Sequence, residues 1–161
     1  MKKIINFPTK QILDSNEYFE NYIKIKDQLL KSIDKKELNK IIKEILLAGK
    51  KNINIFSCGN GGSASTAEHL SCDFSKGTCT NTNLNLKVFS LSSNTSLVTA
   101  IANDISYNDI FSYQLNRFGK ANDVLLAFSV SGTSKNIIEC AKIAKKKKLR
   151  LFHSLDLMVE N

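Results

Sequence analysis

An alternation of short apolar segments with segments of helical periodicity constrains the fold of this chain most strongly. The segment 123–128 is almost continuously apolar, which is typical of a central strand buried on both faces of a parallel sheet. Strands that alternate with helices along a chain form right-handed βαβ units. We therefore predict strands at 52–57, 87–91, 123–128 and 149–152, and helices at 64–74, 94–102, 110–118 and 134–146.

Two further helices are predicted before the first strand, over residues 10–32 and 34–47. Asp34 and Glu37 have the spacing of a capping box, and Gly49 is expected to stop the second helix. Their apolar stripes exceed what the α/β core alone covers, which indicates a subunit interface and an oligomer. We predict a single domain with an interface pair at 1–50, an α/β core at 51–148 and a tail at 149–161.

Composition excludes several classes of protein. No apolar run approaches the roughly 20 residues of a membrane span, and the start has no secretory apolar region, so we expect a cytoplasmic protein without membrane contact. The four cysteines form no C-x-x-C pair and are expected to be reduced and mostly buried. The net charge is +8, but no aromatic residues interleave the lysine run 145–148 and no recognition-helix signature is present. We therefore expect no nucleic-acid partner, and attraction of a phosphorylated substrate by the positive field.

The loop Gly59-Asn60-Gly61-Gly62-Ser63 follows a predicted strand and precedes a helix. Glycines let the backbone approach an anion closely, and the helix start offers N–H groups and a positive dipole end. The pattern is not G-x-G-x-x-G, because Ala64 occupies the third glycine position. The loop alone is compatible either with ligand contact or with a tight connection between strand and helix.

The second loop, Ser129-Val130-Ser131-Gly132-Thr133-Ser134, also stands between a strand and a helix. Ligands of open parallel sheets bind at the carboxyl ends of strands, where both loops lie. Hydroxyl and N–H groups can surround a phosphate without a full charge beside it. Helix capping by Thr133 or Ser134 is the alternative. Four hydroxyl groups exceed what a cap needs.

Segments 58–73, 100–111 and 122–138 resemble the sugar isomerase (SIS) domain and, within it, the D-sedoheptulose 7-phosphate isomerases. The resemblance rests on G-N-G-G-S, H-x-x-x-[DE], A-x-x-N-D and S-x-S-G-x-S in the family's order and spacing. It implies a three-layer αβα fold and a homotetramer. It also implies interconversion of sedoheptulose 7-phosphate and D-glycero-D-manno-heptose 7-phosphate, which supplies heptose for lipopolysaccharide, capsule or related glycans.

The resemblance also implies roles for individual residues. His69 and Asp73 would be metal ligands, for zinc, and Asp73 would also move a proton between the sugar carbons as the catalytic residue. The serine turn would hold the phosphate, with Val130 between its first two serines. The substrate-binding residues implied in this way are Asn60, Gly61, Gly62, Ser63, Asn103, Asp104, Ser129, Val130, Ser131 and Ser134.

The chemistry of isomerisation agrees with these roles. The reaction needs a base and an acid to move the proton, and a donor or metal to stabilise the enediolate. His69 and Asp73 are four residues apart, so they share one helix face just beyond the glycine turn. Imidazole and carboxylate are suitable zinc ligands. A surface His–Asp pair without function is the alternative.

The sequence departs from the family in three places. Asp73 stands where well-studied members carry Glu, and Val130 replaces a hydroxyl residue. Family chains continue through another strand, a T-G-x-x-G-G turn and a final helix that supplies a Gln and a His. We interpret the tail 149–161 as a frameshift product after the lysine run 145–148, because one permitted codon string, shifted by one base, restores K-T-I-S-F-T-G-F-D-G-G-K. We therefore expect weak or absent isomerase activity; the gene sequence tests the frameshift.

Two other functions are compatible with parts of the pattern. A non-catalytic SIS-type module would keep both loops, bind a sugar phosphate and hold no zinc at His69 and Asp73. A nucleotide-binding α/β protein is disfavoured, because the sequence lacks both G-x-G-x-x-G and the lysine of a P-loop.

Overall fold

The computed structural model describes residue 8 and residues 10–153 and contains one four-stranded parallel sheet. Its strands are β1 (Asn54–Gly59), β2 (Lys87–Ser90), β3 (Val124–Phe128) and β4 (Arg150–His153), in the spatial order β2-β1-β3-β4. All neighbouring pairs are parallel. The four predicted strands and their parallel arrangement are confirmed.

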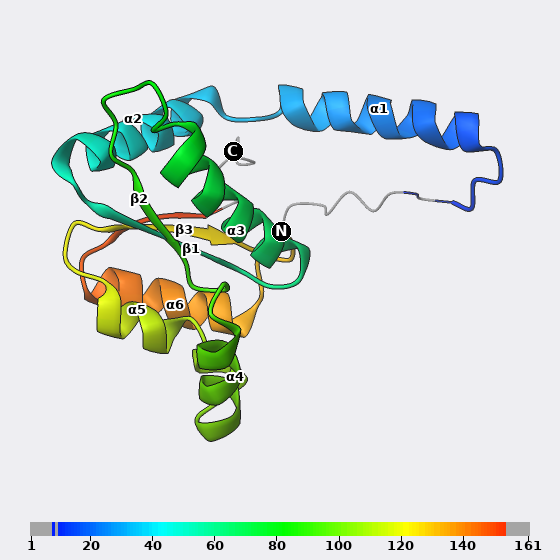
Figure 1. The fold of residues 1–161 in the computed structure, drawn as a ribbon. Coiled ribbons are helices and arrows are strands. Elements are labelled where there is room, and N and C mark those ends of the chain that lie inside the picture. Colours follow the sequence, from blue (N-terminus) through cyan, green and yellow to red (C-terminus); the bar gives the residue numbers. More distant parts are fainter. Residues whose placement is uncertain (1–7, 9, 154–161) are drawn as a thin grey trace.

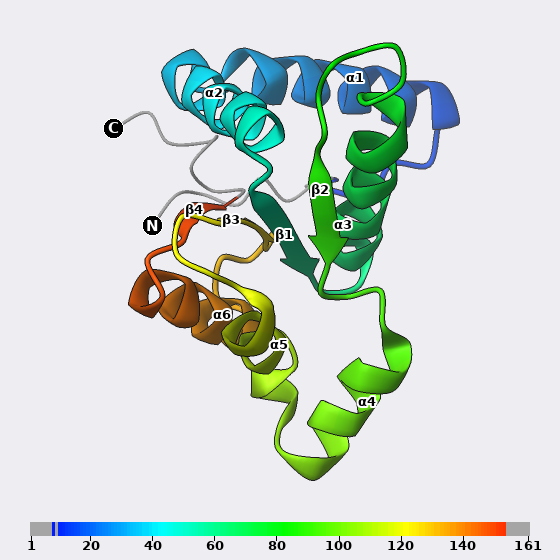
Figure 2. The ribbon, with the colours of Figure 1, turned by 60° about the vertical axis from the view of Figure 1, so that its left-hand side comes forward.

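Helices cover both faces of the sheet, which confirms the three-layer αβα prediction. The helices α2 (Lys35–Lys51) and α3 (Gly62–Cys72) lie on one face, and α5 (Ser112–Phe118) and α6 (Lys135–Lys146) lie on the other (Figure 1). The helix α4 (Thr95–Asp104) projects from the body below the sheet (Figure 2). The helix α1 (Ser15–Lys31) extends as an arm, so the two predicted N-terminal helices are present.

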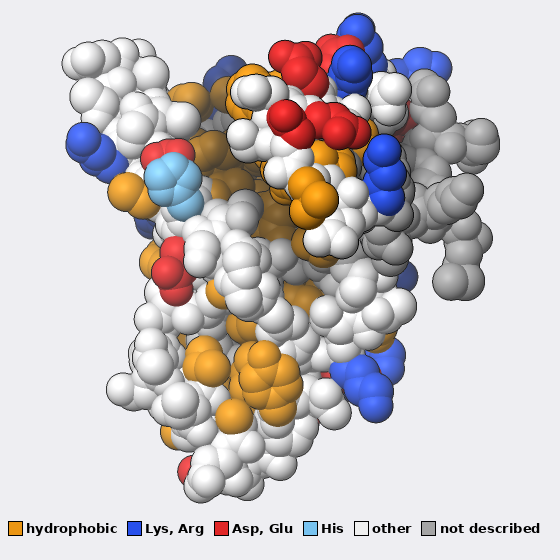
Figure 3. Space-filling model, turned by 90° about the vertical axis from the view of Figure 1, so that its right-hand side faces the viewer, with side chains coloured by type: hydrophobic (Ala, Val, Ile, Leu, Met, Phe, Trp, Pro, Cys, Tyr) orange, Lys and Arg blue, Asp and Glu red, His pale blue; other side chains and the backbone are white. Residues whose placement is uncertain are grey.

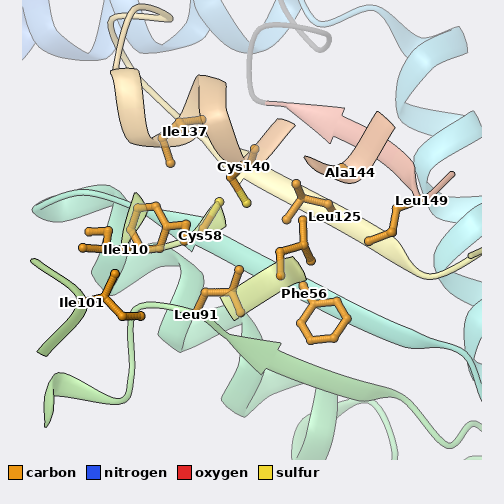
Figure 4. Packing of buried hydrophobic residues seen from close by; sticks show 13 residues of the cluster. Phe56, Cys58, Leu91, Ile101, Ile110, Leu125, Ile137, Cys140, Ala144 and Leu149 are labelled. Carbon is orange, nitrogen blue, oxygen red and sulfur yellow. The ribbon is translucent and has the colours of Figure 1, made fainter. Parts of the chain in front are cut away.

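The core consists of two layers, because strand side chains alternate between the faces of the sheet. On the α5–α6 side, Phe56 and Cys58 of β1 and Leu125 of β3 pack with helix residues such as Cys140 of α6 (Figure 4). The alternate strand residues pack on the α2–α3 side, where the buried members are Ala48, Ile55, Leu86, Val88, Val124, Leu126 and Phe152. Both central strands are therefore buried on both faces, as the apolar segment 123–128 predicts.

Asp34 caps α2 as predicted, since its Oδ1 accepts hydrogen bonds from the backbone N–H groups of Lys36 (2.7 Å) and Glu37 (3.3 Å). The predicted stop at Gly49 is wrong. The helix continues to Lys51 and ends at Asn52, which adopts a left-handed conformation with φ 56°. Gly49 is instead buried inside the helix, where an added Cβ would lie 2.9 Å from Cδ2 of Leu86.

The helix expected over 64–74 begins at Gly62, and its hydrogen-bonding pattern changes at Asp73. A single π-helical turn, η1 (Asp73–Gly77), follows, with the Thr78 N–H donating to the Asp73 carbonyl at 2.8 Å. Such turns are uncommon and frequently lie at functional sites. The turn places the Asp73 backbone at a junction between two helical geometries.

The strand predicted at 149–152 is confirmed as β4, which pairs with β3. Arg150 ties this strand to the rest of the molecule through an ion pair with Glu44 of α2 and a 2.6 Å hydrogen bond from Nη2 to the Asn122 carbonyl. Thus the first residues of the proposed altered tail belong to the sheet. The remaining residues of the predicted tail, 154–161, lie outside the described residues.

All four cysteines are free, as predicted, but only Cys58 and Cys140 are buried. Cys79 is half-buried and Cys72 is exposed. A hydrogen bond with Cys58, burial and the charge of Cys58 raise the pKa of the Cys140 thiol well above its usual value. The Cys140 thiol therefore stays protonated in the core. Within the described residues, no helix is long and apolar enough to cross a membrane.

Candidate functional site

The strand order brings the two loops predicted to bind a ligand to one point of the sheet. The chain leaves β1 toward β2 on one side, and β3 returns to the other side of β1. Gly59 at the end of β1 is paired with Phe128 at the end of β3. The Gly59–Ser63 loop and the Ser129–Ser134 loop therefore start from adjacent strands at the same edge. This is the switch point where ligands of open α/β sheets bind.

The glycine turn is tight because two of its glycines are sterically required. Gly59 is buried, and an added Cβ would lie 2.4 Å from the Ser63 carbonyl oxygen. Gly61 has φ 54° and ψ −123°, a conformation that side-chain-bearing residues rarely adopt. The Ser63 N–H donates to the Asn60 carbonyl at 3.0 Å, which closes the turn into α3.

The serine turn is organised by its own hydroxyl groups. Ser129 Oγ accepts from the Gly132 N–H at 3.1 Å and donates to Ser134 Oγ at 3.2 Å. Ser131 Oγ accepts from the Thr133 N–H at 3.2 Å. Ser134 is the N-cap residue of α6, yet its side chain makes no capping hydrogen bond. The capping alternative therefore does not account for this hydroxyl.

The two turns line one cavity of about 510 Å³. Its lining contains hydroxyl, amide and apolar groups and no charged side chain: Asn60, Gly62, Ser63, Thr66, Phe128, Ser129, Val130, Ser131 and Ser134. The structure thus brings seven of the sequence-predicted binding residues together around one space. Val130 is 82% exposed, so it borders the cavity at the surface.

A second cavity, of about 440 Å³, adjoins the first along α3. Thr66 lines both cavities. His69, about one helical turn after Thr66, and Asp73, a further turn along, line the second cavity. His69 Nε2 lies 3.3 Å from Asp73 Oδ2, and both side chains are exposed. The predicted shared helix face of His69 and Asp73 is present, and it continues directly from the loop-lined cavity.

Two donors do not make a complete zinc site. Zinc in proteins takes about four ligands, of which at least three usually come from the protein. Among the described residues, no group of three or more His, Cys, Asp or Glu side chains is placed to hold a metal. The described part of one chain therefore supplies a pair of ligands and does not build the whole coordination shell.

Asn103 and Asp104 lie at the end of α4 and are exposed. The Asn103 amide donates to Asp104 Oδ1 at 2.8 Å, and neither residue lines the two cavities described above. The segment that follows them does reach the site, because the Tyr107 hydroxyl donates to Asn60 Oδ1 at 3.1 Å. Asn103 and Asp104 are therefore close in sequence to a residue that contacts the site, but they do not line either cavity.

Sequence reasoning missed Asn136, which is only 2% exposed and forms two hydrogen bonds with the Asn60 side chain. The missed signal lies in the periodicity of α6. Asn136 falls on the same stripe as the buried residues Ile137, Cys140 and Ala144. An amide at a core position of a helix demands a hydrogen-bonding partner.

Comparison with known proteins agrees with the family resemblance of the two turns and the histidine helix. The SIS domain profile matches residues 17–152. Phosphoheptose isomerase of Shewanella denitrificans is 40% identical over 144 residues, covering 84% of this chain and 66% of the relative. Phosphoheptose isomerase of Clostridium acetobutylicum is 35% identical over 141 residues, which cover 88% of this chain and 68% of the relative.

A solved structure of phosphoheptose isomerase from Neisseria gonorrhoeae superposes with a TM-score of 0.76 at 31% identity, covering 86% of this chain and 71% of that one. The chain spans about two thirds of the length of the curated relatives it matches. The match extends across both turns, the histidine helix and the sheet. The chain belongs to the SIS domain family and, within it, is a relative of the phosphoheptose isomerases.

Proposed function

We propose that this protein is an aldose–ketose isomerase of seven-carbon sugar phosphates, acting on sedoheptulose 7-phosphate and D-glycero-D-manno-heptose 7-phosphate in heptose biosynthesis. The observation that carries the proposal is the convergence of the glycine and serine turns on one cavity beside His69 and Asp73. The relatedness to phosphoheptose isomerases supports the same reaction.

In this proposal, hydroxyl and N–H groups of Ser129, Ser131 and Ser134 hold the phosphate, and Asn60 with the glycine turn contacts the sugar. A net charge of +8 favours the approach of a dianionic substrate. Asn103 and Asp104 remain proposed substrate contacts, which requires α4 to approach the ligand. The lack of a charged side chain in the cavity means that phosphate recognition relies on directed donors.

The proposed chemistry is transfer of one proton between neighbouring sugar carbons. The Asp73 carboxylate removes a proton from C1 of the ketose, and an enediolate forms. The Asp73 carboxyl group, whose proton exchanges with solvent, then gives a proton to C2 while the hydroxyl proton moves from O1 to O2. His69 and Asp73 are also proposed as two ligands of a zinc ion. That ion would need further ligands beyond those that the described residues supply, so no step here depends on it.

Titration calorimetry with sedoheptulose 7-phosphate and with unphosphorylated sedoheptulose tests the phosphate site. We expect Ser131→Ala and Ser134→Ala each to weaken binding of the phosphorylated sugar about tenfold, because each removes a hydrogen bond to a charged group. Ser15→Ala, at an exposed position at the start of α1, is the matched control and should leave binding unchanged. Equal binding of both sugars by the unsubstituted protein contradicts the proposal.

A non-catalytic sugar-phosphate binding module is the second candidate. The specific observation in its favour is that the described residues provide only the His69–Asp73 pair for a metal. Zinc content separates the two functions, measured with turnover on the same purified sample. The module binds the sugar phosphate, holds no zinc and leaves the substrate unchanged, whereas the isomerase converts it.

We propose further that the protein assembles with copies of itself through α1 and α2, up to the tetramer that the resemblance implies. No residue of α1 is buried, and Phe19, Ile23 and Leu30 are 61%, 45% and 60% exposed. Viewed from the side toward which α1 extends, hydrophobic side chains gather in a recess below charged ones (Figure 3). Exposure of this much apolar side chain on one helix favours burial against a partner of the same kind.

Sedimentation velocity tests the assembly. We expect Ile23→Asp and Leu30→Asp to shift the protein to a smaller species, because a carboxylate cannot be buried in an apolar interface without a partner. Lys24→Asp, at an exposed position on the opposite, polar side of α1, is the control. A monomer for the unsubstituted protein, or no shift for either variant, contradicts this assignment.

The proposal also places the protein in the cytoplasm, because its substrate is a charged sugar phosphate and its cysteines are free thiols. No nucleic-acid partner is proposed, since the candidate site is lined by hydroxyl, amide and apolar groups and by no row of basic side chains.

A further inference from the structure

Asn60 and Asn136 form a reciprocal amide pair that joins the glycine turn to α6. The Asn60 Nδ2 donates to Asn136 Oδ1 at 2.9 Å, and the Asn136 Nδ2 donates to Asn60 Oδ1 at 2.8 Å. These residues are 76 positions apart in the chain. The pair therefore joins the turn between β1 and α3 to α6, the helix that follows the serine turn.

The orientation of both amides is fixed by one backbone group. The Ile137 N–H, which can only donate, points at Asn136 Oδ1 at 3.0 Å. The Asn136 oxygen must therefore face this N–H, and its NH₂ group must face Asn60. It follows that Asn60 turns its oxygen toward Asn136, where the Tyr107 hydroxyl also donates to it at 3.1 Å.

This chain of contacts determines what Asn60 presents to the cavity it lines. Its oxygen is occupied by Asn136 and Tyr107, and one of its two N–H groups is occupied by Asn136. The second N–H has no acceptor among the described residues. An oxygen atom of a sugar or phosphate in the cavity can accept it, and a donor group of a ligand would find no acceptor there.

We propose that Asn136 is a positioning residue for the sugar-phosphate site, which holds Asn60 in the orientation that offers an N–H donor to the substrate and sets the spacing between the two turns. This assignment rests on the proposed function. Burial supports it, because Asn136 is 2% exposed and cannot touch a ligand from solvent, whereas Asn60 is only half-buried and lines the cavity.

A double-substitution cycle tests the assignment by titration calorimetry with sedoheptulose 7-phosphate. We expect Asn136→Ala to raise the Kd about tenfold through loss of the ordered Asn60 donor. In an Asn60→Ala background, the same Asn136 substitution should change the Kd less than about twofold, because its effect passes through Asn60. A residue with a purely structural role would weaken binding by the same factor in both backgrounds.

Two further variants keep the test decisive. Asn136→Ser retains a hydroxyl oxygen for the Ile137 N–H but is too short to reach Asn60, so it should reproduce the loss even if Asn136→Ala does not fold. Asn39→Ala, at an exposed position in α2, is the control and should bind as the unsubstituted protein does. The positioning role of Asn136 is overturned if Asn136→Ser binds sedoheptulose 7-phosphate with unchanged affinity, or if the Asn136 substitution weakens binding equally in the unsubstituted and the Asn60→Ala backgrounds. Either result leaves the proposed function standing. Absence of sugar-phosphate binding by the unsubstituted protein overturns the proposed function and this assignment together.

Discussion

Substitution of Gly59 by alanine is expected to lower the free energy of unfolding by about 3 kcal/mol, the upper range for forced overpacking of a buried site. The added Cβ would lie 2.4, 2.5 and 2.7 Å from the carbonyl oxygen, carbonyl carbon and Cβ of Ser63. Two of these atoms are backbone, so a side-chain rotation cannot relieve the contact. For a chain of 161 residues, this loss corresponds to a Tm lower by about 10 °C.

Gly62→Ala is the matched control for this prediction. Position 62 lies three residues further along the same turn, and an added Cβ there meets no heavy atom within 4 Å. Since Gly62 is the first residue of α3, alanine there should leave stability unchanged or raise it slightly. Chemical denaturation of both variants measures the difference. Equal stability of the two variants would show that the turn is not as tight as its geometry indicates.

Asp73→Asn is expected to slow proton transfer on the substrate by about 10² to 10⁴, the usual contribution of a general base. The amide keeps the shape of the carboxylate but cannot take a proton. Binding of sedoheptulose 7-phosphate should change less than about twofold, because the proposed phosphate site is the neighbouring cavity lined by the serine turn. The loss should therefore appear in kcat and leave KM nearly unchanged.

Release of deuterium from substrate labelled at C1 measures this step directly, even at low turnover. Asp73→Glu is the informative companion variant, because its side chain is one methylene longer and the family resemblance implies Glu at this position. The longer carboxylate should retain or increase the exchange rate. An Asp73→Asn protein that exchanges the label as fast as the unsubstituted chain would remove Asp73 from the proposed chemistry.

The sheet and its ligand-binding edge were predictable because they depend on local patterns. The almost continuously apolar segment 123–128 is typical of the middle of a parallel sheet, and the turns at the carboxyl ends of the strands of such a sheet share an edge. The capping aspartate Asp34 likewise acts within its own turn of helix. The placement of His69 and Asp73 on one face follows from helical spacing alone.

Features that depend on distant contacts were not predictable in the same way. Gly49 reads as a helix stop, but it stays inside α2 because Leu86 of another segment packs against it. Asn136 acquires its role from Asn60, which is 76 positions away, and neither sequence neighbourhood reveals the other. Asn103 and Asp104 match a family motif, yet the projection of α4 keeps them out of the cavity lining.

The proposed function requires that the glycine and serine turns bind one sugar phosphate between them. Backbone amide NMR signals, followed during titration with sedoheptulose 7-phosphate, test it most directly. Signals of Gly61–Ser63 and of Ser131–Ser134 are expected to shift together and to saturate at the same ligand concentration. Shifts confined to one turn, or centred on the lysine-rich end of α6, would contradict it.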